Sequence, residues 1–138
     1  MRSRSLVLSL TLITVTVTAG LVIRFGHLGL PLLVIKYGGS TLWALMIYWI
    51  VSTLLPGWRI SVFALIAGLV ATLVECFKLY HSPDLDAFRL TRPGILLLGR
   101  FFSVWDIAAY WLAIWVGALI DQRIRLRAEK SRVRHSTT

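Results

Sequence analysis

Charged residues are scarce in this chain. Only 15% of its 138 residues are Asp, Glu, Lys or Arg, whereas a soluble domain carries about a quarter charged residues. Apolar residues make up 57% of the chain, and the mean hydropathy is +0.77. The composition is therefore too apolar for a soluble domain, and the length allows one domain at most.

Cysteine is nearly absent as well. Cys76 is the only one in the sequence, so no disulfide can form within the chain. It lies inside an apolar run, where a thiol behaves as a small hydrophobic group. Cysteine usage therefore says nothing about the redox compartment.

Common catalytic and metal-binding motifs are missing too. The sequence has no Walker-type loop, no dinucleotide-binding fingerprint and no candidate Ser-His-Asp set. His27 and His81 fall near Asp84 and Asp86, but their spacing does not match that of a metal site. We therefore expect no metal and no cofactor.

Long apolar segments are what the chain does have. A hydrocarbon core of ~30 Å is crossed by roughly 20 helical residues. The sequence predicts an all-α integral membrane bundle at 1–121, followed by a basic tail at 122–138. Its four transmembrane helices are expected at about 5–23, 41–55, 60–80 and 101–120. The glycine-rich stretch 24–40 predicts a turn and a short re-entrant or interfacial segment, although the second helix could start near Lys36.

The first apolar segment has a second interpretation. Arg2 and Arg4 precede it and small residues follow near Ala19 and Gly20, as in a cleavable signal peptide. Its uncharged run is longer than the ~7–15 residues of a signal's apolar region, which favours a retained membrane helix. Whether segment 5–23 is retained or cleaved stays open at this point.

The distribution of basic residues predicts the orientation, because Lys and Arg near membrane spans favour the cytoplasmic side. With four spans, both termini share one side. That side holds nine basic residues against six on the other. The nine are Arg2, Arg4, Arg59, Arg123, Arg125, Arg127, Lys130, Arg132 and Arg134, and the six are Arg24, Lys36, Lys78, Arg89, Arg92 and Arg100. We expect a multi-pass protein of the cell inner (plasma) membrane with both termini in the cytoplasm.

The basic tail has a predicted partner and a limited role. It lacks the interleaved aromatic residues typical of nucleic-acid binding, so we expect no nucleic acid. Anionic lipid headgroups suit it better, at about 1 kcal/mol per Lys or Arg near the surface. The tail also lacks a stable apolar face, so it is expected to tether the protein without contributing to the core, and truncation after Arg123 should leave a folded protein.

Ionisable residues gather in the outer half of the predicted bundle. Charges in a bilayer are costly, so they normally face the bundle interior and pair. Long basic side chains such as Arg24, Lys78, Arg89 and Arg92 can instead reach water. Short carboxylates cannot, so we expect Glu75 and Asp106 to be buried and paired. Arg100 is the predicted partner of one or both.

Small and polar side chains at helical spacing predict the faces that pack together. They form three stripes: Ser40, Ala44 and Tyr48; Glu75, Lys78 and Leu79; and Ser103, Asp106, Tyr110, Ala113 and Gly117. We expect the three stripes to face one another, and the opposite, apolar faces to contact lipid.

At these residues the chain resembles domain of unknown function 2809, over about residues 20–120. The resemblance rests on Val74–Tyr80 with Asp86, Arg89, Thr91 and Gly94; on Leu98, Gly99, Phe102, Trp105–Ile107 and Tyr110; and on Leu30, Pro31, Lys36–Gly38, Leu42–Ala44 and Tyr48. Ser40 stands where this family leads us to expect an acidic residue, and Lys78 where it leads us to expect Gln.

A weaker resemblance links the chain to the VanZ-like membrane proteins. Glu75, Lys78, Arg100, Asp106 and Tyr110 keep their spacing, with Lys and Tyr in place of that group's Gln and Asn. VanZ-like proteins are linked to teicoplanin resistance, so this resemblance implies a bacterial cell-envelope setting. Neither resemblance supplies an activity.

The functional hypothesis is an envelope accessory or binding protein with an outward-facing polar pocket for an anionic headgroup or lipid-linked ligand. The candidate binding residues are Glu75, Asp106, Arg100, Arg89, Lys36, Lys78 and Tyr110. Arg100, Arg89 and Lys36 would hold the anion, and the two carboxylates would hold the cations. One alternative is a small membrane enzyme with Glu75 or Asp106 as general base. Another is an oligomeric transporter subunit.

Overall fold

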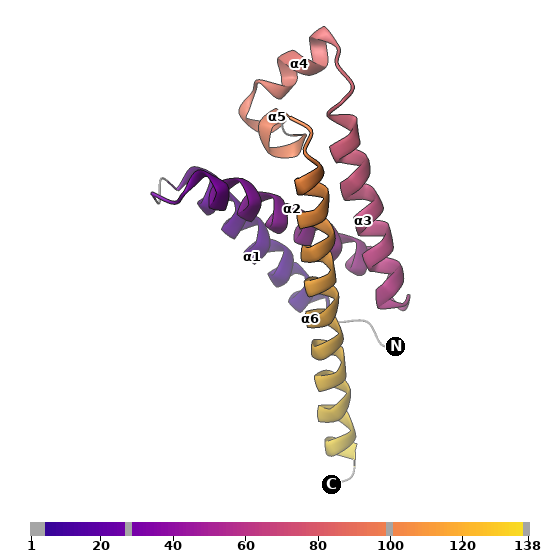
Figure 1. Ribbon diagram of the computed structural model, residues 1–138. Helices are drawn as coiled ribbons and strands as arrows, with labels where there is room; N and C mark the ends of the chain where they lie inside the picture. The colour runs from indigo at the N-terminus through magenta and orange to yellow at the C-terminus, as the bar shows by residue number, and fades with distance from the viewer. Residues whose placement is uncertain (1–4, 27–28, 99–100, 137–138) are drawn as a thin grey trace.

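Helices make up all the regular secondary structure in the described part of the chain. The computed structural model describes residues 5–26, 29–98 and 101–136. The helices are α1 (Leu6–Phe25), α2 (Leu32–Leu54), α3 (Ile60–Phe77), α4 (Pro83–Arg89), α5 (Arg92–Leu97) and α6 (Val104–Ser136) (Figure 1). The all-α prediction is confirmed.

Four of these helices are long and apolar enough to cross a membrane. They are α1, α2, α3 and the part of α6 from Val104 to Ala128. Large apolar side chains cover their outer surfaces, among them Leu32, Leu73 and Trp105, each more than 65% exposed. Lipid suits such a surface and water does not, so the helices have the character expected of a membrane bundle.

The second long helix starts earlier than the sequence predicted. α2 begins at Leu32 rather than Thr41, directly after Pro31. Proline is tolerated at a helix start because its missing N–H would have no partner there. Within the described residues, α1 ends at Phe25 and residues 32–40 form the first part of α2, so residues 32–40 are not a separate re-entrant piece.

Two short helices replace the polar connection between α3 and α6. Ser82 precedes α4 and its hydroxyl accepts a hydrogen bond from the Leu85 N–H at 3.4 Å. Thr91 does the same for the Gly94 N–H at the start of α5, at 3.1 Å. Such N-cap side chains satisfy N–H groups that a helix leaves unpaired. Both helices lie at one end of the bundle (Figure 1).

α2 is the central helix, because it packs against α1, α3 and α6, while α3 also packs against α6. Two of the three predicted stripes meet in this core. Ala44 and Tyr48 of α2 and Ala113 of α6 are all buried. A Cβ on Gly117 would lie 2.7 Å from the Leu45 side chain, so the missing side chain permits the close approach of α2 and α6.

The prediction for the remaining stripe, Glu75, Lys78 and Leu79, is only partly correct. Glu75 and Lys78 are buried, but Leu79 is 60% exposed. α3 ends at Phe77, so Leu79 no longer follows the helical spacing on which its placement depended.

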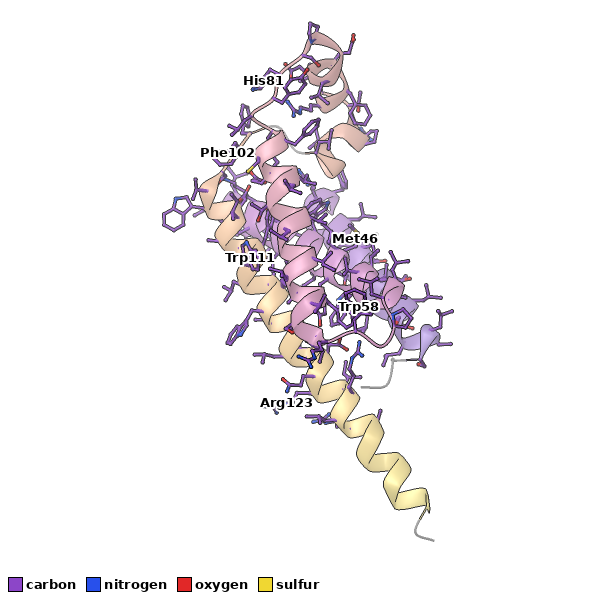
Figure 2. The ribbon with its side chains drawn as sticks, turned by 90° about the vertical axis from the view of Figure 1, so that its right-hand side faces the viewer. Met46, Trp58, His81, Phe102, Trp111 and Arg123 are labelled. Carbon is purple, nitrogen blue, oxygen red and sulfur yellow. The ribbon has the colours of Figure 1, made fainter. Side chains whose placement is uncertain are left out.

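α6 continues well past the predicted end of the fourth span. It runs without a break to Ser136 and projects beyond the other helices (Figure 1). Arg123, expected to belong to a separate tail, lies on this helix (Figure 2). The basic segment is therefore an extension of the last membrane helix.

Candidate functional site

Glu75 lies fully buried in the last turn of α3. Its Oε1 accepts a hydrogen bond from the Ser103 N–H at 2.8 Å, and its Oε2 accepts one from the Tyr110 hydroxyl at 2.7 Å. The Lys78 ammonium forms an ion pair with Oε2. A buried carboxylate is tolerated when it is both paired and hydrogen-bonded, and Glu75 meets both conditions.

The Lys78 side chain points into the bundle and does not extend to water. Its side chain is only 8% exposed, because the ammonium turns back to Glu75 three residues earlier. The expectation that Lys78 reaches water is therefore wrong. The pair brings one positive and one negative charge into the bundle together, so its net charge is zero.

Asp106 lies in the first turn of α6 and is 4% exposed. Its Oδ1 is buried and has no hydrogen-bond partner among the described residues. In a capping box, a carboxylate at this position accepts the N–H of the residue three positions earlier. Here that residue is Ser103, and its N–H is taken by Glu75. Among the described residues, Asp106 Oδ1 is thus an acceptor without a donor.

This carboxylate lines a half-open cavity of about 490 Å³. The cavity lies where the C-terminal ends of α1 and α3 meet the N-terminal ends of α2 and α6, beside α5. Its lining residues are Arg24, Leu32, Ile35, Lys36, Gly39, Ser40, Trp43, Val74, Lys78, Ile95, Leu98, Phe101, Phe102, Ser103, Asp106 and Tyr110. Phe102 marks this end of α6 in Figure 2.

The cavity combines positive charge with that single carboxylate. Arg24 and Lys36 line it, and both side chains are exposed rather than buried. The Arg24 guanidinium donates a hydrogen bond to the Ile95 carbonyl oxygen at 3.2 Å, which links α1 to α5. The Lys36 ammonium lies 5.2 Å from the centre of the Tyr37 ring. Both cations thus line the same cavity as Asp106.

Five of the seven predicted site residues come together at this end of the bundle. Four of them line the cavity, namely Lys36, Lys78, Asp106 and Tyr110. Glu75 lies behind them, with hydrogen-bond donors on both of its oxygens. Arg100 falls outside the described residues, so its predicted pairing with Glu75 or Asp106 remains a prediction.

Arg89 lies away from the cavity. It is 3% exposed, and its guanidinium donates to the carbonyl oxygens of Phe77 and Tyr80, each at 2.8 Å. Asp86 accepts a third hydrogen bond from it at 3.1 Å. The guanidinium thus binds one carbonyl at the C-terminal end of α3 and one in the turn that follows it. Arg89 therefore ties α4 to the end of α3, and its predicted role in ligand binding remains a prediction.

A family model for proteins of unknown function, DUF2809, matches residues 30–114, which is more than half of the chain. The chain belongs to this family. The matched region contains every residue of the cavity lining except Arg24. The resemblance to this family seen in the sequence is thus confirmed, and the weaker resemblance to VanZ-like proteins is not. No solved structure matches the chain.

A second polar cluster joins residues inside the DUF2809 match to Asp121 and Arg125, which lie after it. Asp121 of α6 is fully buried and accepts hydrogen bonds from the Tyr48 hydroxyl at 3.1 Å and from the Arg125 Nε at 3.0 Å. The Arg125 guanidinium also lies 5.3 Å from the centre of the Phe63 ring. Sequence reasoning missed this cluster because it ended the span at residue 120. The four-residue spacing of Asp121 and Arg125 was the available signal.

Proposed function

We propose that this DUF2809 protein binds an anionic group that also carries a hydrogen-bond donor, in the cavity between the ends of α1, α2, α3 and α6. The observation that carries the proposal is the buried Asp106 Oδ1, which lines the cavity without a partner among the described residues. A buried acceptor without a partner costs about 1–3 kcal/mol, and more when it is charged. A ligand that donates to this oxygen recovers that cost.

Positive charge supports the anionic part of the ligand. Lys78 is neutralised by Glu75, which leaves Arg24 and Lys36 as the cations that a ligand can pair with in the described lining. The N-terminal ends of α2 and α6 also border the cavity, and helix N-termini favour negative charge. Arg and Lys bind phosphate oxygens through charge-assisted hydrogen bonds.

The carboxylate restricts which anions fit. An anion alone would be repelled by Asp106, so the bound group must present an ammonium or a hydroxyl to that side of the cavity. A phosphate ester with an adjacent ammonium, as in phosphoethanolamine, meets both requirements. The basic-residue asymmetry of the sequence predicts that the cavity faces the outer side of the membrane. The further proposal of an accessory role in a bacterial cell envelope rests on the weaker resemblance to VanZ-like proteins.

The two alternative functions stay predictions. Of the two carboxylates considered as a general base, Glu75 has donors on both oxygens, so Asp106 is the better candidate. An oligomeric transporter subunit would need a pathway shared between copies. Neither alternative has a specific observation in its favour, so binding is the function we propose.

Thermal unfolding of the full-length protein in detergent tests the proposal, with phosphoethanolamine and phosphocholine as probes. Both carry phosphate and a positive nitrogen, but only phosphoethanolamine has N–H donors. A ligand at 100 times its dissociation constant stabilises the folded state by about 2.7 kcal/mol. We expect phosphoethanolamine to raise the unfolding temperature more than phosphocholine does.

The matched variants are Asp106→Asn and Asp84→Asn. Asp84 is exposed on α4 and does not line the cavity, so Asp84→Asn should keep the preference while Asp106→Asn loses it. Equal responses to the two probes in the unmodified protein would refute the donor requirement. No response to either probe would refute binding at this cavity.

A further inference from the structure

An apolar groove of about 190 Å³ adjoins the cavity, between α1 and α2. Its lining residues are Thr16, Val17, Gly20, Leu21, Arg24, Gly39, Leu42, Trp43 and Met46. Met46 marks this side of α2 in Figure 2. Arg24, Gly39 and Trp43 line both the groove and the cavity, so the two spaces are continuous.

The groove offers almost nothing to a polar ligand. Apart from Arg24 at the junction, Thr16 carries its only hydroxyl, and that hydroxyl donates to the Leu12 carbonyl at 2.6 Å. The remaining side chains are apolar. Burial of hydrocarbon stabilises by roughly 25 cal/mol per Å², so a hydrocarbon chain is the chemistry that the groove accommodates.

Two glycines keep the groove open. A Cβ on Gly39 would meet no atom within 4 Å, and one on Gly20 would meet only Leu42, at 3.7 Å. Each glycine lies inside a helix, where it costs about 1 kcal/mol relative to alanine. The space that these positions leave empty lies along the path from the groove to the cavity.

We propose that the ligand of the cavity is a membrane lipid, with its headgroup beside Asp106 and one hydrocarbon chain in the groove between α1 and α2. This proposal rests on the proposed function, because it takes the anionic, donor-bearing group to be that headgroup. Arg24 at the junction is placed to pair with the phosphate where headgroup and chain meet. Apart from the hydrogen bond of Arg24 to α5, α1 packs against α2 among the described helices, so the groove lies at the edge of the bundle, which a lipid can reach from the bilayer.

Photo-crosslinking of the full-length protein in vesicles tests the position of the chain. The probe is phosphatidylethanolamine with a diazirine in one acyl chain, and the cross-linked peptides are mapped by mass spectrometry. We expect cross-links to concentrate on Val17–Leu21 and Leu42–Met46. Gly20 lines the groove and not the cavity, so Gly20→Leu should fill the groove and lower cross-linking there by about tenfold, which corresponds to about 1.4 kcal/mol of binding free energy.

Two further variants separate loss of the groove from loss of the fold. Gly39→Leu places a side chain at the junction and should lower the same cross-links. Gly38→Ala is the matched control, because a Cβ there would touch only Ile23, at 3.7 Å, and Gly38 lines neither space. All three substitutions raise helix propensity, so unfolding temperatures near that of the unmodified protein are expected.

The outcomes distinguish the two proposals. Groove cross-links that fall in Gly20→Leu, with the phosphoethanolamine response intact, support the lipid assignment. A preserved phosphoethanolamine response with cross-links spread evenly over all lipid-facing helices would overturn the chain position and leave the headgroup site standing. Loss of the phosphoethanolamine response in the unmodified protein would overturn both.

Discussion

The carboxylate of Glu75 has three donors, which come from both sides of the interface between α3 and α6. Lys78 follows it within one turn, whereas Ser103 and Tyr110 lie at the start of α6. The hydrogen bonds from Ser103 and Tyr110 to the Glu75 carboxylate hold the start of α6 against the end of α3. The burial of this charge therefore also fixes the position of α6 relative to α3. Removal of a buried partner costs more than the pair contributes, since it leaves the other charge unpaired.

Glu75→Gln should therefore destabilise the protein by about 3–5 kcal/mol. The amide keeps the shape of the side chain but leaves the Lys78 ammonium buried without its carboxylate. Chemical unfolding in detergent, followed by tryptophan fluorescence, measures the change. Lys78→Met should also destabilise, because it leaves the carboxylate without its cation.

The double variant Glu75→Gln/Lys78→Met provides the control. Removal of both charges should cost much less than the sum of the single changes, because neither charge is then left unpaired. Additive losses would show that the two side chains do not act as a pair.

The burial of Glu75 and Asp106 could be predicted from the sequence, because short carboxylates cannot reach water from within a span. The placements of Lys78 and Arg89 could not. A long basic side chain can reach either water or a buried partner, and which of the two it contacts depends on where the preceding helix ends. α3 ends at Phe77, which turns the following chain back so that Arg89 reaches the carbonyl oxygens of Phe77 and Tyr80.

At the scale of elements, α6 departs most from its predicted extent. Charged residues begin at Asp121, and a hydropathy criterion ends the span there. The helix continues because Asp121 and Arg125 pair within one turn and because neither Gly nor Pro follows Gly117 before its end at Ser136. The first part of the basic segment thus belongs to the packed bundle.

Truncation after Arg123 should therefore lower stability, contrary to the expectation from sequence. It removes Arg125, and a hydrogen bond to a charged group contributes about 1.5–3 kcal/mol. Truncation after Arg127 keeps this contact and should unfold at nearly the temperature of the full chain. Thermal unfolding of both truncated proteins in detergent measures the difference.

A point substitution isolates the contact from the effect of chain length. Arg125→Ala should lower stability by an amount similar to truncation after Arg123, while Arg127→Ala, at an exposed position, should have little effect. Identical unfolding temperatures for Arg125→Ala and Arg127→Ala would show that Arg125 does not stabilise the bundle, as the sequence analysis expected of the whole tail.

At the scale of the whole molecule, the number and character of the long helices were predictable, because length and apolarity decide both. The cavity was only partly predictable. Helical spacing indicated which stripes would meet, and the sequence named Lys36 as a binding residue. It did not indicate that α2 would begin at Leu32 and add Leu32, Ile35 and Gly39 to the lining. The groove was not predictable, since it depends on how α1 crosses α2.

The orientation in the membrane gives a prediction at this scale. The excess of basic residues on the side of the termini predicts that side to be cytoplasmic. Reporter fusions after Gly57 and at the C-terminus should therefore show cytoplasmic activity, and a fusion at Ser82 should show periplasmic activity. Periplasmic activity at the C-terminus would reverse the orientation and place the cavity on the cytoplasmic side.

The order in which the chain is synthesised follows from the position of α6 as the last helix. Tyr48 is made long before Asp121, and Glu75 before Ser103 and Tyr110, so these polar groups enter the membrane before their partners on α6 exist. Lys78 is the exception, because it leaves the ribosome directly after Glu75 and can neutralise it during insertion. These contacts form only once α6 is made, so a chain stalled before α6 would expose unsatisfied polar groups to lipid and be a substrate for quality-control proteases.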